Sequence, residues 1–266
     1  GPGPDGIHPR VLNEFSTVIA MPLHLIFQDS LRSGMVQRDW RIANVVPLKK
    51  GSRSQPENYR LVSLTSVVGK LLEGVIRVRV LEYIAVHNTI SLCQHGFMRN
   101  RSCQTNSVFF YEEVSRNLDA GKAVHVIYLG FAKAFDTVPH RRLMIKLRNI
   151  GGIRDQAASW FSSYLSNRSF SVTLANKSST PVTLSVGVPQ GSVLGPLLFS
   201  LYTLSLGDLI SSFGLKYHLY ADDIQIYLDT PALTADVQTQ WCKISFKCNS
   251  NELSTLPETF SVVLMF

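Results

Sequence analysis

Two adjacent acidic residues, Asp222 and Asp223, stand between two apolar segments of strand composition, residues 215–220 and 224–228. Apolar strands joined by so short a connection predict a hairpin, with both carboxylates at its tip. Neighbouring carboxylates repel each other, and a divalent cation with oxygen ligands offsets that repulsion well. The pair therefore predicts either a Mg²⁺-binding hairpin or a solvated turn, and the surrounding sequence has to decide between them.

The rest of the chain alternates segments of helical and strand character. Apolar residues recur every three or four positions in several segments, which predicts helices, whereas short apolar runs predict strands. The predicted helices cover residues 9–34, 66–86, 104–118, 140–165 (two short helices broken at Gly151-Gly152) and 192–210. The predicted strands cover residues 42–48, 124–129, 170–174 and 182–186, and the last five residues have strand composition. This pattern predicts a mixed α+β domain preceded by a more helical lobe.

A glycine-rich segment, residues 186–199, lies upstream of the hairpin and opens a predicted helix. Glycine lets the backbone approach a ligand closely, and the N–H groups at a helix start can face an anion. Phosphate or nucleotide binding fits this segment, and the alternative is a loop with only packing duties. A third segment, residues 128–140, follows a predicted buried strand and contains Gly130 and Asp136.

In their order and amino-acid sequence, these three segments resemble motifs A (residues 128–140), B (residues 186–199) and C (residues 220–223) of reverse transcriptases. Shorter segments match the family's N-terminal motifs in the same order along the chain. They are residues 3–9, 40–47, 58–66 and 94–102. The motif sequences are most similar to those of LINE-type (non-LTR) retrotransposons of the Jockey-like and related clades. The group II intron maturase, which shares Tyr-Ala-Asp-Asp, is the alternative within polymerases.

The resemblance covers essentially the whole chain and implies an α+β right-hand polymerase fold. It implies a helical fingers lobe over residues 1–118 and a palm over residues 119–266, with an antiparallel sheet backed by helices. The thumb is expected to be absent from this sequence. The chain is expected to be a fragment of a longer retrotransposon polyprotein.

The resemblance also implies nucleotidyl transfer that uses two Mg²⁺ ions, an RNA template, a DNA primer and deoxynucleoside triphosphates. Asp222 is implied as a metal ligand, with Asp223 in support. Other positions are implied to contact the nucleotide or template. They are Phe131, Phe135, Gln190, Gly191, Lys49, Lys50 and Arg60.

Several residues depart from the family pattern, and Gly130 is the most consequential because it stands where the motif A aspartate belongs. Glycine cannot ligate a metal, and losing one positioned electrostatic group commonly costs on the order of 10²–10³ in rate. Asp136 is expected to be structural rather than a replacement ligand. Leu61 replaces a proline, Met98 an arginine and Thr259 a motif D lysine, so we predict a decaying, inactive copy.

The net charge and the cysteine spacing bear on which partners and metals this protein binds. The net charge of +7 suits either a polyanion partner such as nucleic acid or a solubilising surface, and residues 1–118 hold 14 Lys/Arg against 9 Asp/Glu. The four cysteines form no C-x-x-C pair, so a zinc site is not expected.

Two alternatives to an inactive polymerase remain: a non-catalytic nucleic-acid-binding remnant, and a fragment that does not fold stably. The family implies an intracellular location, nuclear or cytoplasmic.

Overall fold

The structure is a computed structural model that describes residues 2–49, 58–131, 133–149, 152–174, 177–231 and 260–265. These residues form two compact units, each built from two separate stretches of the chain. The first unit combines Gly1–His87 with Phe135–Leu198, and the second combines Asn88–Ala134 with Phe199–Phe266. The units are defined by packing, so the functional division at residues 118 and 119 stays a prediction.

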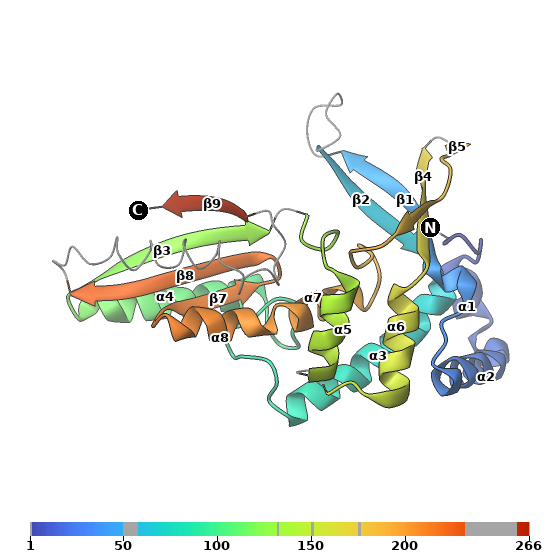
Figure 1. Cartoon of the computed structure of the whole chain (residues 1–266), viewed down its shortest axis with the longest axis horizontal. Helices are drawn as coiled ribbons and strands as arrows, with labels where there is room; N and C mark the ends of the chain where they lie inside the picture. Colours follow the sequence, from blue (N-terminus) through green and yellow to red (C-terminus); the bar gives the residue numbers. More distant parts are fainter. Residues whose placement is uncertain are drawn as a thin grey trace. The chain divides into compact units, whose positions relative to one another are not determined.

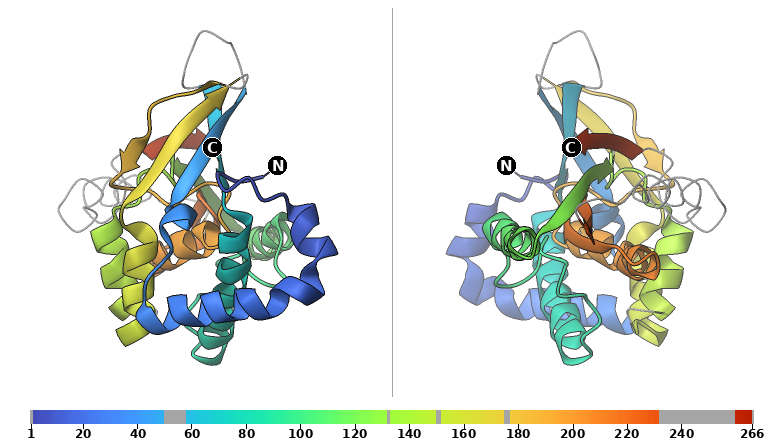
Figure 2. Two further views of the ribbon diagram at one scale, coloured as in Figure 1. Left: turned by 90° about the vertical axis from the view of Figure 1, so that its right-hand side faces the viewer. Right: turned by 90° about the vertical axis from the view of Figure 1, so that its left-hand side faces the viewer.

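The first unit is a twisted sheet with helices around it (Figure 1). Its strands follow the order β2-β1-β4-β5, with β6 also paired to β4; β1 and β4 run parallel and the other pairs are antiparallel. Both views of Figure 2 show β1, β2 and β4 side by side. The strands are β1 (Ile42–Lys49), β2 (Tyr59–Thr65), β4 (Arg168–Leu174), β5 (Lys177–Ser178) and β6 (Val182–Leu184). The helices are α1 (Pro9–Glu14), α2 (Ser16–Ser33), the 3-10 helix η1 (Arg38–Arg41), α3 (Val67–Val86), α5 (His140–Asn149) and α6 (Asp155–Leu165), with α7 (Gly195–Tyr202) beginning in this unit.

The second unit is a four-stranded antiparallel sheet with a helix on each face. The strands follow the order β7-β8-β3-β9. They are β3 (Lys122–Phe131), β7 (Lys216–Tyr220), β8 (Asp223–Pro231) and β9 (Phe260–Met265), and the helices are α4 (Cys103–Asp119) and α8 (Leu204–Ser212). Consecutive strand residues point to opposite faces. His218 faces α4, where its ring contacts Phe110, whereas Tyr217 faces α8 at Gly207.

The local signals in the sequence explain where several elements start and stop. Serine is favoured at the start of a helix, and the Ser66 hydroxyl accepts the Gly69 N–H at 3.2 Å just before α3. Glycine is favoured just after a helix, and Gly34 ends α2 with a left-handed φ of 68°. The predicted helix over residues 9–34 is interrupted at Phe15, and Pro22 lies inside α2.

The predicted helix over residues 192–210 is wrong in its continuity, because the structure has α7 and α8 with Thr203 between them. The Thr203 hydroxyl donates to the carbonyl oxygens of Phe199 and Ser200, which competes with a continuous helix. The mixed helix-and-sheet class and the other predicted elements are confirmed. Within the described ranges, no helix combines the length and the apolar character that crossing a membrane requires.

Candidate active site

The acidic hairpin of the second unit is as tight as the sequence predicts. Tyr220 pairs with Asp223 across β7 and β8, which leaves only Ala221 and Asp222 in the loop. Two-residue hairpin loops need positive φ, and Ala221 has a φ of 59°. For a residue with a Cβ this conformation costs roughly 1–2 kcal/mol, so the surroundings have to hold it in place.

The segment around Gly96 holds the hairpin from one side. The His95 N–H donates to the Leu219 carbonyl at 2.8 Å, and the Leu219 N–H donates to the Cys93 carbonyl at 2.9 Å. A Cβ added to Gly96 would lie 2.1 Å from the Ala221 nitrogen, so only glycine fits there. From the sequence, this segment was identified only as a family motif, and its contact with the hairpin was not predicted.

Replacing Gly96 by alanine is expected to destabilise the second unit by roughly 1–3 kcal/mol, because backbone cannot yield to the added methyl group. The matched control is Gly74→Ala, at a helical position where an added Cβ meets nothing within 4 Å. Removing a mid-helix glycine stabilises by roughly 0.5–1 kcal/mol. Thermal unfolding should therefore move in opposite directions for the two variants, and equal shifts would contradict the close approach of Gly96 to Ala221.

Gly130 lies directly beside the hairpin. It is opposite Asp223 in the antiparallel register of β3 and β8, so a side chain at position 130 would share a face with that carboxylate. A Cβ at Gly130 would have Asp223 Oδ1 as its only close neighbour, at 3.8 Å, among the described residues. A pocket of about 330 Å³ opens at this point. Its lining is Asn106, Tyr128, Leu129, Gly130, Tyr220, Asp223, Ile224 and Gln225.

The two carboxylates of the hairpin lie close together, and no cationic side chain of the described residues neutralises them. Partial burial and the Asp222 charge raise the pKa of Asp223. Within the described ranges neither carboxylate has an ion-pair partner, and no three His, Cys, Asp or Glu side chains group as metal ligands. The residues present therefore do not fit the ligand set that the resemblance implies, because β3 contributes no carboxylate at Gly130.

In the first unit, the motif B loop (within residues 186–199) is hydrogen-bonded to residues 135–140. The Gln190 side-chain amide donates to both carboxylate oxygens of Asp136 at 3.2 Å, and the Val188 N–H donates to the Phe135 carbonyl at 2.7 Å. The Ser63 N–H on β2 donates to the Gln190 carbonyl at 2.8 Å. Gly191 has a φ of 106°, and a Cβ there would lie 2.5 Å from the Ser63 carbonyl oxygen, so this position also requires glycine.

A buried acid, Glu73 of α3, holds the next part of the loop. Its Oε2 accepts the N–H of Val193 at 2.7 Å and that of Leu194 at 3.0 Å, and the residue is 4% exposed. Burial raises the pKa of Glu73, against the opposing effects of these two N–H groups and of the Arg168 charge. Glu73 was not predicted from the sequence. The sequence feature that could have indicated a buried acid is the position of Glu73, next to Leu72 and three residues before Ile76 on an apolar helix face.

The predicted site residues fall into separate groups in the structure. Gly130, Asp222 and Asp223 lie together in the second unit, whereas Phe135, Gln190 and Gly191 lie in the first. Phe131 is 5% exposed and packs on the Phe199 ring, which leaves little of it for a nucleotide. The structure does not describe the side chains of the remaining predicted residues. Lys49 and Arg60 lie near the ends of β1 and β2, and Lys50 and Thr259 lie outside the described residues.

A family model for "Reverse transcriptase (RNA-dependent DNA polymerase)" matches residues 48–258. The chain belongs to the reverse transcriptase family. It is 31% identical over 237 residues to the RNA-directed DNA polymerase of the mobile element jockey from Drosophila funebris, which covers 85% of this chain and 25% of the relative. It is 25% identical over 244 residues to the Pol polyprotein of retrotransposable element R2 from Popillia japonica, covering 87% of this chain and 33% of the relative. The predicted likeness to non-LTR retrotransposon reverse transcriptases is thus confirmed.

The chain spans about a quarter of the length of the jockey relatives. Solved structures agree on the fold. The telomerase of Candida tropicalis with a fragment of telomeric RNA has a TM-score of 0.62 at 11% identity, over 92% of this chain and 44% of that one. The telomerase of Candida albicans has a TM-score of 0.56, over 86% of this chain and 44% of that one. The predicted polymerase fold is confirmed by these likenesses.

Proposed function

We propose that this chain is the RNA-directed DNA polymerase domain of a non-LTR retrotransposon whose site has lost one metal-binding carboxylate. The observation that carries the proposal is the position of Gly130 on β3, directly opposite Asp223 and without a side chain. The family match supports the polymerase assignment, and the mobile-element relatives support a non-LTR retrotransposon over a group II intron maturase. The substrates are an RNA template, a DNA primer and deoxynucleoside triphosphates.

The proposed roles follow the groups seen in the structure. Asp222 would be the surviving ligand for a Mg²⁺ ion, with Asp223 in support, and such an ion would supply charge neutralisation at the reacting phosphate. Gln190 and Gly191 line the nucleotide and template side. Asp136 is expected to be structural rather than a replacement ligand, and the Gln190 amide that donates to both of its oxygens supports that role. The rest of the retrotransposon polyprotein is the expected covalent partner, as the R2 relative's name supports.

Primer extension on an RNA template with Mg²⁺ tests the proposal, comparing this chain with Gly130→Asp. Each is joined to the C-terminal part of the jockey polymerase. Extension by the variant alone supports both the polymerase assignment and the lost ligand. Equal extension by the unaltered chain overturns the loss of activity, and no extension by either chain overturns the polymerase assignment.

A non-catalytic nucleic-acid-binding domain is the second candidate. The net charge of +7 favours it, together with a metal site that lacks a carboxylate on β3. Salt-dependent RNA binding without extension by the Gly130→Asp variant would favour this candidate over the polymerase.

A further inference from the structure

Helix α5 of the first unit is strongly cationic. Its ten residues include Arg141, Arg142, Lys146 and Arg148 and no Asp or Glu. The helix buries Leu143 and Leu147. Arg141 and Arg148 are exposed and stand seven residues apart, which is two turns or about 10 Å along one side of a helix. The helix therefore presents a row of positive charge on the side away from its buried leucines.

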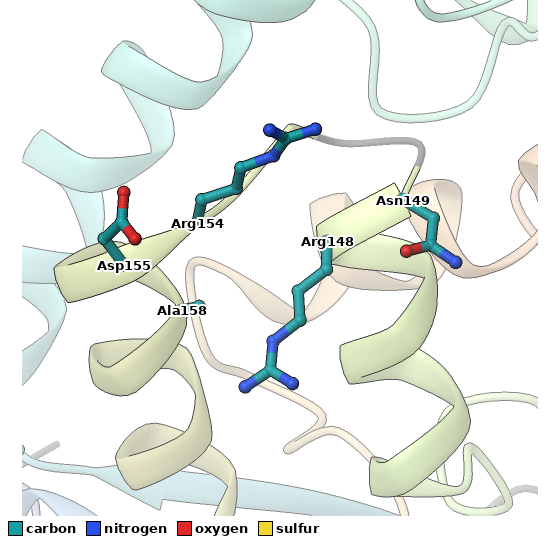
Figure 3. A pocket seen from close by; sticks show the side chains of 5 residues that line it. All are labelled: Arg148, Asn149, Arg154, Asp155 and Ala158. Carbon is teal, nitrogen blue, oxygen red and sulfur yellow. The ribbon is translucent and has the colours of Figure 1, made fainter.

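A concave region begins where this row ends. A cavity of about 640 Å³ lies between the end of α5 and the start of α6. Its lining is Arg148, Asn149, Arg154, Asp155 and Ala158. Figure 3 shows the Arg148 guanidinium between the two helices, whereas the Asp155 carboxylate and the Arg154 guanidinium both point away from it. Asp155 is the single acid of this lining, so the two arginines leave the cavity with a net positive charge.

Arg148 and Arg154 differ from the three arginines of the described residues that form ion pairs. Arg10, Arg79 and Arg116 each have an acidic partner three or four residues away on the same helix. Among the residues that the structure describes, Arg148 and Arg154 have no ion pair. Guanidinium groups free of carboxylates can bind phosphate oxygens through two parallel N–H bonds.

We propose that the surface formed by Arg141, Arg148 and Arg154 binds the sugar–phosphate backbone of an RNA strand, as a contact separate from the hairpin and the motif B loop. The cavity alone would suit a single phosphate group, but Arg141 extends the row of charge well beyond it. A chain of phosphates matches that length. The proposal rests on the proposed function only in taking nucleic acid as this protein's substrate.

Fluorescence anisotropy with a single-stranded RNA, titrated with salt, tests the surface in the chain as it is. The double variant Arg148→Gln/Arg154→Gln is compared with Arg10→Gln/Arg79→Gln, which removes the same charge from ion-paired positions of the same unit. Each lost phosphate contact should lower the slope of log Kd against log salt by about 0.7, and the affinity should fall by roughly tenfold at about 0.1 M salt. The control should stay close to the unaltered chain.

The outcomes separate this surface from the proposed function. Equal losses in the two double variants would reduce the effect to net charge and overturn the proposal, as would no loss in either. No RNA binding by the unaltered chain at low salt would overturn the nucleic-acid role itself and this surface with it. The single variants Arg148→Gln and Arg154→Gln remove one charge each, so each should lower the salt slope by about 0.7, and they serve as a second test should the double variant fail to fold.

Discussion

Restoring an aspartate at position 130 is expected to raise the rate of primer extension by at least a factor on the order of 10²–10³. The backbone position accepts a Cβ, because among the described residues an added Cβ at Gly130 would meet only Asp223 Oδ1, at an ordinary contact distance of 3.8 Å. The new carboxylate would come from β3 and those of Asp222 and Asp223 from the hairpin, so the acids would approach the site from two strands. Single-turnover extension on an RNA template measures the gain.

Two control variants separate the metal ligand from other effects of the added side chain. Gly130→Asn has nearly the same shape without the charge and should remain inactive. Gly74→Asp adds the same charge at an open helical position and should leave extension at the level of the unaltered chain. Recovery of activity with Gly130→Asn would show that the side-chain volume, and not the carboxylate, had been missing.

A second measurement on Gly130→Asp does not depend on activity. A third carboxylate next to Asp223, whose pKa is already raised, should lower the unfolding temperature in a chelator. Mg²⁺ should then raise that temperature more in the variant than in the unaltered chain, because a ligand that binds only the folded state stabilises it. Identical Mg²⁺ responses in the two chains would contradict the assignment of position 130 as a metal ligand position.

The sequence predicted those parts of the fold that depend on neighbouring residues. Apolar strands on both sides of a short acidic connection predict a hairpin. Ser66 and Gly34 mark helix ends, through a local hydrogen bond and a local backbone conformation. It could not predict pairings between distant segments. The parallel contact of β1 with β4 joins Val45 to Val172, and no local pattern encodes it.

The same distinction holds for the candidate site. The acidic pair and the glycine at position 130 could be recognised from the sequence because they are residue types at fixed spacings. Gly96 and Glu73 were not, because each acts through a contact that exists only after folding: Gly96 with Ala221, and Glu73 with the N–H groups of Val193 and Leu194. A side chain's identity is visible in a sequence, but whether it is buried against a polar partner is not.

Replacing Glu73 by alanine is expected to destabilise the protein by roughly 3–5 kcal/mol, the usual cost of removing one partner from a buried charged group. The change leaves the N–H groups of Val193 and Leu194 without their acceptor, and it removes the negative charge beside Arg168, which is 1% exposed. Glu73→Gln keeps an acceptor oxygen, so a smaller loss, on the order of 1–3 kcal/mol, is expected. Denaturant unfolding gives both values.

The control for this prediction lies on the same helix. Glu82 forms an exposed ion pair with Arg79, so Glu82→Ala should change stability by no more than about 1 kcal/mol. A loss from Glu73→Ala as small as that from Glu82→Ala would show that Glu73 does not hold the motif B loop.

The pH dependence of unfolding tests the same carboxyl group independently. Because burial raises the pKa of Glu73 above its ordinary value of 4.5, the folded protein binds this proton more tightly than the unfolded chain. The resulting stabilisation is fully present below pH 4.5 and is lost as the pH rises through the folded-state pKa. The free energy of unfolding of the unaltered chain should therefore fall across that window relative to Glu73→Gln, which has no proton to release. Parallel curves for the two proteins would mean that the pKa of Glu73 is not raised in the folded state.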